Sequence, residues 1–216
     1  MLNYIKKKIR SSPSLRRAIK GFLLNFKFLI YRWKWMALSK KSEIKLELGS
    51  GSKKGLNGWT TVDMNGGSDI SWDLKKGIPL QDNNVKTIYS SHLLEHIPFH
   101  ELIIFLKECR RVMIAGGEFS VCVPNFRCYV DAYVNNKFFL EKDRCWPPAI
   151  IDTGSKIDQL NYMAYMTDEH KYMFDEENLI NTLYKAGFAN VKLRDFDESL
   201  DSLDRDFESI YALATK

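Results

Sequence analysis

The stretch Ile44-Lys45-Leu46-Glu47-Leu48-Gly49-Ser50-Gly51 decides the fold of this chain. Apolar and polar residues alternate until two glycines spaced G-x-G, which predicts a strand ending in a tight turn. A second short strand, 58–62, ends in Asp63. Glycines let the backbone approach a bound group closely, and a carboxylate one strand away can accept both hydroxyls of a ribose. A lone G-x-G occurs in many turns, so the motifs downstream decide whether this is a site for a nucleotide-like ligand.

The residues after Asp63 alternate between expected strands and expected helices. We expect strands at 69–74, 85–90, 118–123, 191–194 and 207–214, and helices at 98–113 and 175–187. The first helix should begin at Pro98 and end before Gly116-Gly117. Its buried face should carry Leu102, Phe105, Leu106, Cys109 and Val112. Little room for a helix remains between Gly51 and the second strand. Strands alternating with helices predict an α/β domain with a mostly parallel sheet, helices on both faces, and ligands beyond the carboxyl ends of the strands.

Charge separates the chain into two parts. The net charge is +5, yet residues 1–42 contain twelve Lys or Arg and no acidic residue. The part from 43 to 216 is therefore net acidic, and we expect it to be one domain with an attached basic arm. The four cysteines form no C-x-x-C pair, which is typical of reduced thiols in the cytoplasm and not of a disulfide framework or a zinc site.

The arm has an amphipathic pattern over residues 14–38. Apolar residues recur at spacings of three and four, as on one face of a helix: Leu15, Ile19, Phe22, Phe26, Leu29, Trp33 and Met36. Lysines and arginines interrupt the apolar runs, so neither a bilayer-spanning helix nor a signal peptide is expected. The helix could lie on an anionic membrane surface, pack on the domain, or contact nucleic acid. Its aromatic content favours lipid over nucleic acid, which would place the protein at the inner face of the membrane.

Several ordered motifs in residues 44–124 carry a resemblance to a known family. They are the segments 46–51, 58–63, Asp73-Leu74, 88–96, 108–112 and Gly116-Gly117, with weaker agreement at Gly187-Phe188. In this order they are similar to class I S-adenosylmethionine-dependent methyltransferases, especially the small enzymes of bacterial surface-polysaccharide synthesis. The resemblance implies a Rossmann-like fold with a seven-stranded sheet. Where the common pattern has a third glycine, this chain has Ser52.

The resemblance also implies which residues hold S-adenosylmethionine. Gly49, Ser50 and Gly51 would make room for its methionine moiety, and Glu47 would engage the amino group. Asp63 would accept the ribose hydroxyls, with Met64 beside it. Asp73 and Leu74 would bound the adenine, and Ser90 would border the sulfonium. The alternative for each is structural: plain turns for the glycines, and caps or solvated loop ends for the acids.

Methyl transfer to oxygen benefits from a base, because the acceptor hydroxyl loses its proton. His92, at the end of the strand 85–90, is the first candidate; His170 is the second, and Glu95 could orient either ring. The alternative is that His92 and His96 only shape the pocket or cap a helix. Residues 92–96 also spell H-x-x-E-H, a zinc-protease pattern. Its setting at a strand end, without a clear distal ligand, argues against zinc, and we expect no metal.

Residues 126–172 interrupt the alternating pattern and are rich in aromatic residues, which predicts an acceptor lid or a structural cap over the sheet edge. By family analogy the acceptor would be a sugar or a lipid-linked glycan methylated on oxygen. One alternative is an RNA methyltransferase that uses the basic arm. However, Ser90-Ser91-His92 stands where amino-methylating enzymes have N-P-P-[YF]. Another alternative is a non-catalytic scaffold, against which the intact Gly49, Gly51 and Asp63 argue.

Overall fold

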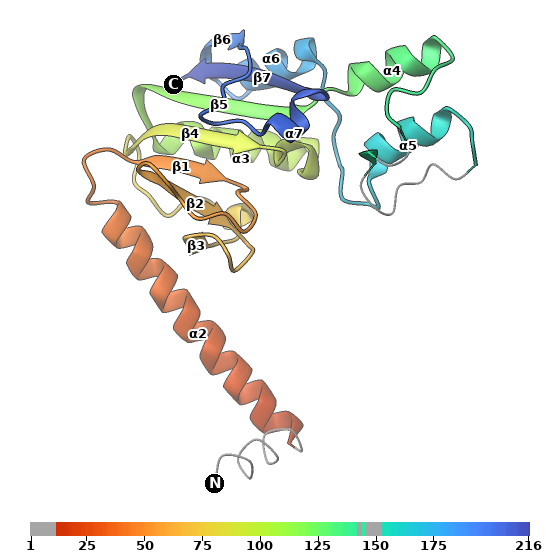
Figure 1. Ribbon diagram of the computed structural model, residues 1–216. Coiled ribbons are helices and arrows are strands. Elements are labelled where there is room, and N and C mark those ends of the chain that lie inside the picture. The colour runs from red at the N-terminus through yellow and green to blue at the C-terminus, as the bar shows by residue number, and fades with distance from the viewer. Residues whose placement is uncertain (1–11, 142–143, 146–152) are drawn as a thin grey trace. The chain divides into compact units, whose positions relative to one another are not determined.

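The computed structural model describes residues 12–141, 144–145 and 153–216 (Figure 1). The chain divides into two compact units, residues 1–41 and 42–216. The interpretation of residues 1–11 as part of the basic arm, and of Trp146 and the Pro147-Pro148 pair as part of the lid, lies outside the described residues.

The first unit contains the helix α2, Pro13–Leu38. Ser12 caps its first turn by accepting a hydrogen bond from the backbone N–H of Leu15, and Pro13 fits the first helical position, where no amide donor is needed. On this helix Leu29, Trp33 and Met36, spaced four and three residues apart, are exposed. None of the described helices combines the length and apolar character that crossing a bilayer requires.

The second unit is built on a seven-stranded sheet with the order β3-β2-β1-β4-β5-β7-β6. Its strands are β1 (Lys45–Leu48), β2 (Trp59–Asp63), β3 (Ile70–Ser71), β4 (Val85–Ser91), β5 (Met113–Pro124), β6 (Ala189–Leu193) and β7 (Ser209–Thr215). The strands β1 to β5 pair in parallel, and β7 runs antiparallel to both β5 and β6. The chain turns directly from β1 into β2 without a helix. This confirms the expected Rossmann-like fold with a seven-stranded, mostly parallel sheet.

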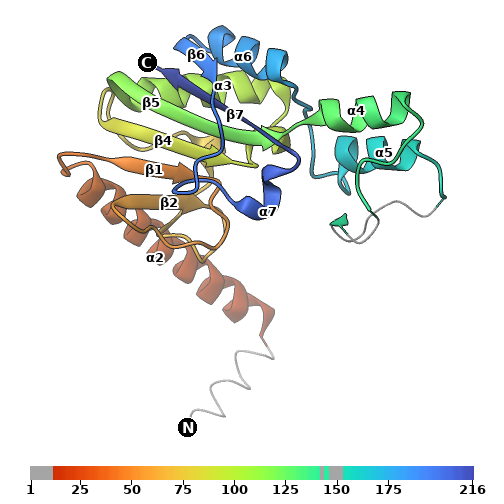
Figure 2. The ribbon, with the colours of Figure 1, turned by 45° about the horizontal axis from the view of Figure 1, so that its top comes forward.

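One face of the sheet carries the main hydrophobic core. The helices α3 (Phe99–Val112) and α6 (Glu176–Lys185) both lie on this face (Figure 2). The five α3 side chains predicted to face the core are all buried. They meet the alternate strand residues that point to the same side, for example Leu46, Ile88 and Phe119. Apolar burial of this extent is the main favourable term in folding.

The opposite face is covered by the segment 194–208, which contains the short helix α7 (Leu203–Asp206) and crosses the strands (Figure 2). This cover is polar. Asp201, whose side chain is 1% exposed, pairs with Arg194 at 2.6 Å and accepts a hydrogen bond from the Tyr89 hydroxyl at 2.9 Å. Arg194 also donates to the Ser120 hydroxyl, on the neighbouring strand. Because both charges are paired and hydrogen-bonded, this network can lie against the sheet at tolerable desolvation cost.

Three expected element boundaries are wrong. The predicted strand 69–74 is only Ile70–Ser71, after which Asp73 caps the 3-10 helix η1 (Leu74–Lys76). The glycine pair Gly116-Gly117 does not separate α3 from β5, because β5 begins at Met113, directly after the helix. The pair instead lies where the β4–β5 register shifts, and Gly116 has φ +71°. The last strand, expected at 207–214, begins only at Ser209, because residues 207–208 form the turn that follows α7.

The predicted lid forms a small helical hairpin. Its helices α4 (Phe126–Val134) and α5 (Ile157–Tyr165) pack around their own buried cluster, which includes Tyr129, Leu140 and Tyr162. The hairpin projects from the carboxyl end of β5 (Figure 1). Its two ends lie together, since the Phe126 N–H donates to the Phe174 carbonyl at 2.8 Å. The Tyr129 hydroxyl donates to Glu208, which ties α4 to the segment before β7.

Candidate functional site

A cavity of about 950 Å³ opens at the carboxyl edge of the sheet, between η1 and α3. Parallel α/β sheets bind ligands at this edge, and the volume is that of an ordinary small-molecule pocket. Five of the residues predicted to bind the cofactor line it: Gly49, Asp63, Met64, Asp73 and Leu74. They come from the ends of β1 and β2 and from η1. The topology therefore brings them to one cavity although they are spread over 26 positions of the chain.

Asp63, the residue predicted to bind the ribose, accepts hydrogen bonds from the turn after β1 and from the loop after β2. One carboxylate oxygen accepts the Gly51 N–H at 2.9 Å, and the other accepts the Asn65 N–H at 2.7 Å. These bonds hold the G-x-G turn against the end of β2. Each carboxylate oxygen has a second lone pair, so the group can still accept two hydroxyls from the cavity side.

Of the other residues predicted to bind the cofactor, some line the cavity and some do not. Asp73 lines it and also caps η1, accepting the Lys75 N–H at 3.1 Å. Glu47, Ser50, Gly51 and Ser90 are not among the lining residues. Glu47 lies 3.4 Å from the Lys53 ammonium. Ser50 and Ser90 are buried, and within the described part of the chain their hydroxyls have no hydrogen-bond partner.

Several lining residues were not identified from the sequence. Leu93, Ile97 and Phe105 provide apolar walls suited to a flat ring, with Trp72 on the η1 side. At the far end, Arg111 pairs with Glu108 at 2.7 Å and donates to the carbonyls of Ile78 and Leu80. This network holds the loop after η1 against α3. The i, i+3 spacing of Glu108 and Arg111 on α3 could have been noticed in the sequence. The loop carbonyls that bind Arg111 are distant from it in sequence and could not.

His92 is placed where a strand ends and a loop begins, with φ +48°. Its side chain is 7% exposed and does not line the cavity between η1 and α3. Its Nε2 lies 3.0 Å from the Ser209 hydroxyl and its Nδ1 3.5 Å from Glu95 Oε1. Burial lowers the pKa of His92 to about 3, so the ring is neutral near pH 7 and only weakly basic.

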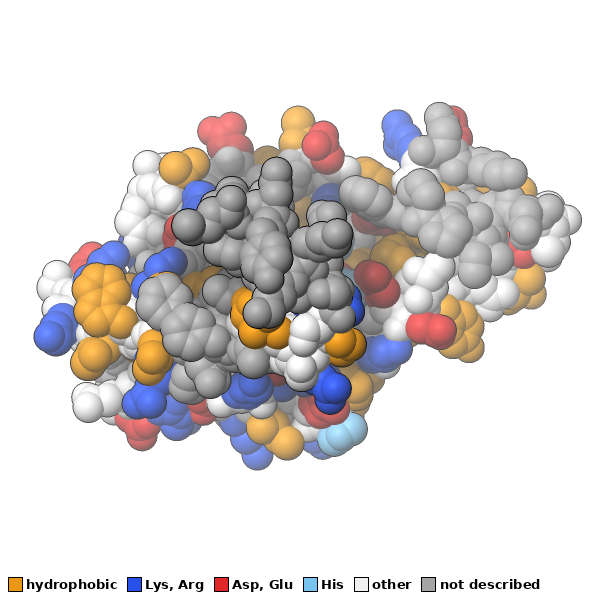
Figure 3. All heavy atoms as spheres, turned by 90° about the horizontal axis from the view of Figure 1, so that it is seen from below, with side chains coloured by type: hydrophobic (Ala, Val, Ile, Leu, Met, Phe, Trp, Pro, Cys, Tyr) orange, Lys and Arg blue, Asp and Glu red, His pale blue; other side chains and the backbone are white. Residues whose placement is uncertain are grey.

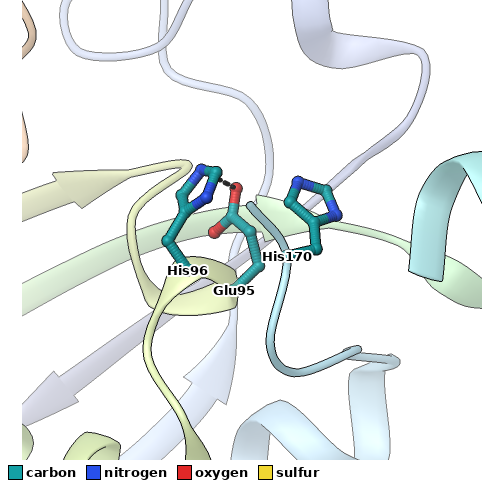
Figure 4. A group of neighbouring side chains, drawn as sticks. All are labelled: Glu95, His96 and His170. Atoms are coloured by element: carbon teal, nitrogen blue, oxygen red, sulfur yellow. Dashed lines mark ion pairs between the residues drawn. The ribbon is translucent and has the colours of Figure 1, made fainter. Parts of the chain in front are cut away.

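Glu95 and His170, the other two catalytic candidates, are close together. Glu95 lies in the 3-10 helix η2 (Leu94–His96), and burial raises its pKa to about 8. Its backbone carbonyl accepts the N–H groups of Lys171 and Tyr172, at 2.7 and 3.1 Å. This brings the segment after α5 onto η2 and sets His170 beside His96, with ring centroids 5.0 Å apart. Figure 4 shows the Glu95 carboxylate between the two imidazoles.

Comparison with known proteins adds a family match. Residues 64–121 match a family model described as a methyltransferase domain. The matched span runs from the end of β2 into β5 and includes η2 and α3. No curated protein matches the chain.

Three solved structures of similar fold have low sequence identity to this chain. An S-adenosylmethionine-dependent methyltransferase from Archaeoglobus fulgidus is 15% identical, with 88% of this chain and 94% of that chain covered and a TM-score of 0.49. One from Mesorhizobium loti is 13% identical, covering 80% and 90%, with a TM-score of 0.47. Phosphoethanolamine N-methyltransferase 2 of Haemonchus contortus, in complex with S-adenosyl-L-methionine, is 10% identical, covering 85% and 52%, with a TM-score of 0.48.

The sheet order, the cavity and the matched domain together define the class of protein. Residues 64–121 form a methyltransferase domain within a Rossmann-like fold.

Proposed function

We propose that the chain methylates a hydroxyl of a sugar or a lipid-linked glycan, with S-adenosylmethionine held in the cavity between η1 and α3. The observation that carries the cofactor placement is the convergence of Gly49, Asp63 and Asp73 on that cavity. In this arrangement Asp63 accepts the ribose hydroxyls, and the adenine lies among Leu74, Ile97 and Phe105. The methionine moiety extends along Gly49 toward Gly51. The roles of Glu47, Ser50, Met64 and Ser90 remain part of the same prediction.

The reaction is an in-line displacement. The acceptor oxygen forms a bond to the methyl carbon, the carbon–sulfur bond breaks, and S-adenosylhomocysteine leaves as a neutral thioether. Holding the oxygen and the methyl group in line supplies much of the rate. The acceptor proton must also be removed. His92 and His170 remain the predicted bases; burial lowers the pKa of both rings, to about 3 for His92.

The helical hairpin supports a sugar acceptor. It carries exposed aromatic rings, Tyr133, Phe138 and Tyr165, which have faces on which a sugar ring can stack. The Lys156 ammonium lies 5.2 Å from the centre of the Phe138 ring. The segment after α5 reaches η2, whose residue His96 lines the cofactor cavity. An acceptor lying on the hairpin would therefore be near the methyl donor.

The face drawn in Figure 3 gives less support to RNA. There, Asp and Glu side chains lie among the Lys and Arg side chains of the described residues. A phosphate backbone needs several cations along one track.

We also propose that α2 attaches the enzyme to the inner face of an anionic membrane. The exposed Leu29, Trp33 and Met36 support this proposal, because they share one side of a 26-residue helix in a part of the chain without acidic residues. An apolar face of this kind enters the headgroup boundary, and the lysines and arginines add attraction to anionic lipid.

Labelled-methyl transfer tests the acceptor. The full chain is incubated with labelled S-adenosylmethionine and separate glycan, lipid and RNA extracts. We expect label in the glycan or glycolipid fraction, released by treatments that cleave sugar ethers and not by mild base. Asp63→Ala should lose this transfer, whereas Asp131→Ala, at an exposed residue of α4, should retain it. Label confined to RNA would contradict the acceptor proposal.

Co-sedimentation with liposomes tests the membrane proposal. The full chain should pellet with vesicles that contain phosphatidylglycerol and stay in the supernatant with neutral vesicles. Trp33→Glu should reduce recovery in the pellet about tenfold or more, since it places a charge on the apolar face. Ile104→Glu, at an exposed apolar residue of α3, is the matched control and should not reduce it. Equal recovery of the native chain with both vesicle types would rule the proposal out.

A further inference from the structure

Glu95 is a buried carboxylate without the partners that such a group requires. Its residue is 2% exposed, and within the described part of the chain neither carboxylate oxygen has a hydrogen-bond partner. His92 Nδ1 and His96 Nε2 approach Glu95 Oε1 only to 3.5 and 3.8 Å. Buried polar side chains nearly always have a partner, so an unmatched carboxylate indicates a missing one.

Two imidazoles present free nitrogens beside this carboxylate. His170 Nδ1 lies 2.6 Å from the Met163 carbonyl, and His96 Nδ1 lies 3.2 Å from the Glu169 carbonyl. A carbonyl can only accept, so each Nδ1 carries the proton and donates it. In the neutral form of each ring, Nε2 is then the nitrogen with a free lone pair. Metal-binding histidines are usually oriented in this way, with the non-ligating nitrogen donating to a carbonyl.

The three groups are close enough to share an ion. One ligand atom from each of Glu95, His96 and His170 lies within 4.8 Å of the others. A tetrahedral ion with bonds of about 2.0–2.1 Å places its ligands about 3.3 Å apart, so small side-chain rotations complete the arrangement. Figure 4 shows the carboxylate and the two rings converging from η2 and from the segment after α5.

The ligand chemistry selects the kind of metal. Two imidazole nitrogens and one carboxylate oxygen suit borderline divalent transition metals such as Zn²⁺, and are unlike the all-oxygen sets of Mg²⁺ and Ca²⁺. His92 is not part of the group whose ligand atoms lie within 4.8 Å of one another, and its Nε2 lies 3.0 Å from the Ser209 hydroxyl. This also separates the site from the zinc-protease pattern, in which both histidines of H-x-x-E-H lie on one helix.

We propose that Glu95, His96 and His170 bind one divalent transition-metal ion, with zinc as the representative. The sequence offered no third ligand, and the segment after α5 supplies it. His96 also lines the cofactor cavity, so an ion there would lie at its border, where it could bind an acceptor hydroxyl and lower the hydroxyl's pKa. The binding proposal does not depend on which acceptor is used.

Metal analysis of the full chain tests this proposal. The protein is stripped with a chelator, titrated with Zn²⁺ by calorimetry, and analysed by mass spectrometry for metal retained after desalting. We expect one zinc per chain, and with Co²⁺ the visible absorption of a low-coordinate nitrogen–oxygen site. Glu95→Gln keeps the shape of the side chain without its charge and should weaken binding by about 100-fold or more, as should His170→Ala.

His100→Ala is the matched control, because His100 is an exposed histidine on α3 with its side chain 79% accessible. It should bind zinc as the native chain does. Far-ultraviolet circular dichroism and S-adenosylmethionine binding show whether each variant is folded. A native chain that retains no zinc, or a folded Glu95→Gln chain that retains one equivalent, would overturn the proposal.

Discussion

Gly49 lies directly against Leu93, so that a Cβ atom added to the glycine would be 2.8 Å from Leu93 Cβ and 2.9 Å from each of its methyl groups. This contact joins the turn after β1 to the loop after β4, and both residues line the cavity between η1 and α3. The first glycine of the G-x-G is thus required by a neighbouring side chain as well as by its positive φ of +74°.

The two glycines of this turn should therefore respond differently to alanine. Both have positive φ, which costs an alanine about 1–2 kcal/mol. Gly51 has open space around an added Cβ among the described residues, whereas Gly49 does not. Urea denaturation without ligand should show Gly49→Ala to be less stable than Gly51→Ala by about 1–3 kcal/mol, the usual cost of overpacking. Equal stabilities would show that Leu93 moves aside freely.

The Arg194–Asp201 pair should matter more for stability than an exposed pair of the same type. Asp201→Asn leaves a largely buried guanidinium without its counter-charge, and should lower the free energy of unfolding by about 3 kcal/mol. Asp131→Asn breaks the exposed Arg127–Asp131 pair on α4 and should change it by less than about 1 kcal/mol. Denaturant titration of both variants measures the difference. A loss at Asp201 no greater than at Asp131 would contradict the role given to the polar cover.

Glu95 should give the metal-free protein a distinct pH dependence. Burial raises its pKa from 4.5 to about 8, so between these values the folded chain holds a proton that the unfolded chain has lost. Stability should fall as pH rises through this window, by up to about 1.4 kcal/mol per pH unit. Burial lowers the pKa of His92 and of His170, which act in the opposite sense, but only below about pH 6.5.

The measurement is best made between pH 6.5 and 8 in chelator. Glu95→Gln has no proton to lose, so its stability curve should be flatter than that of the native chain over this range. Parallel curves would mean that Glu95 is ionised in the folded protein, with an unidentified cation or donor beside it.

Local patterns in the sequence were enough to predict the sheet and to name five of the residues that line the cavity at its carboxyl edge. The alternation before Gly49, the position of Asp63 and the face of α3 each depend on a few neighbouring residues, and parallel topology brings strand ends together. The start of β5 could not be read in this way, because Gly116 and Gly117 are equally suited to end a helix or to occupy a register shift.

Contacts between distant segments could not be predicted either. His170 meets Glu95 and His96 because backbone N–H groups of the segment after α5 bind the Glu95 carbonyl, and no local pattern encodes that pairing. The same holds for the loop carbonyls that bind Arg111, about 30 residues away in sequence. The sequence therefore identified the histidines as candidates, but it did not predict that His170 lies beside Glu95 and His96.

Calorimetry with S-adenosylmethionine tests the central claim most directly. The native chain should bind one equivalent, because the cavity at the sheet edge is formed without ligand. Asp63→Ala should bind at least about tenfold more weakly, since it loses hydrogen bonds to a charged acceptor. Asp131→Ala, remote from the cavity, should bind as the native chain does. Absence of binding to the folded native chain would contradict the assignment of a methyl-donor site.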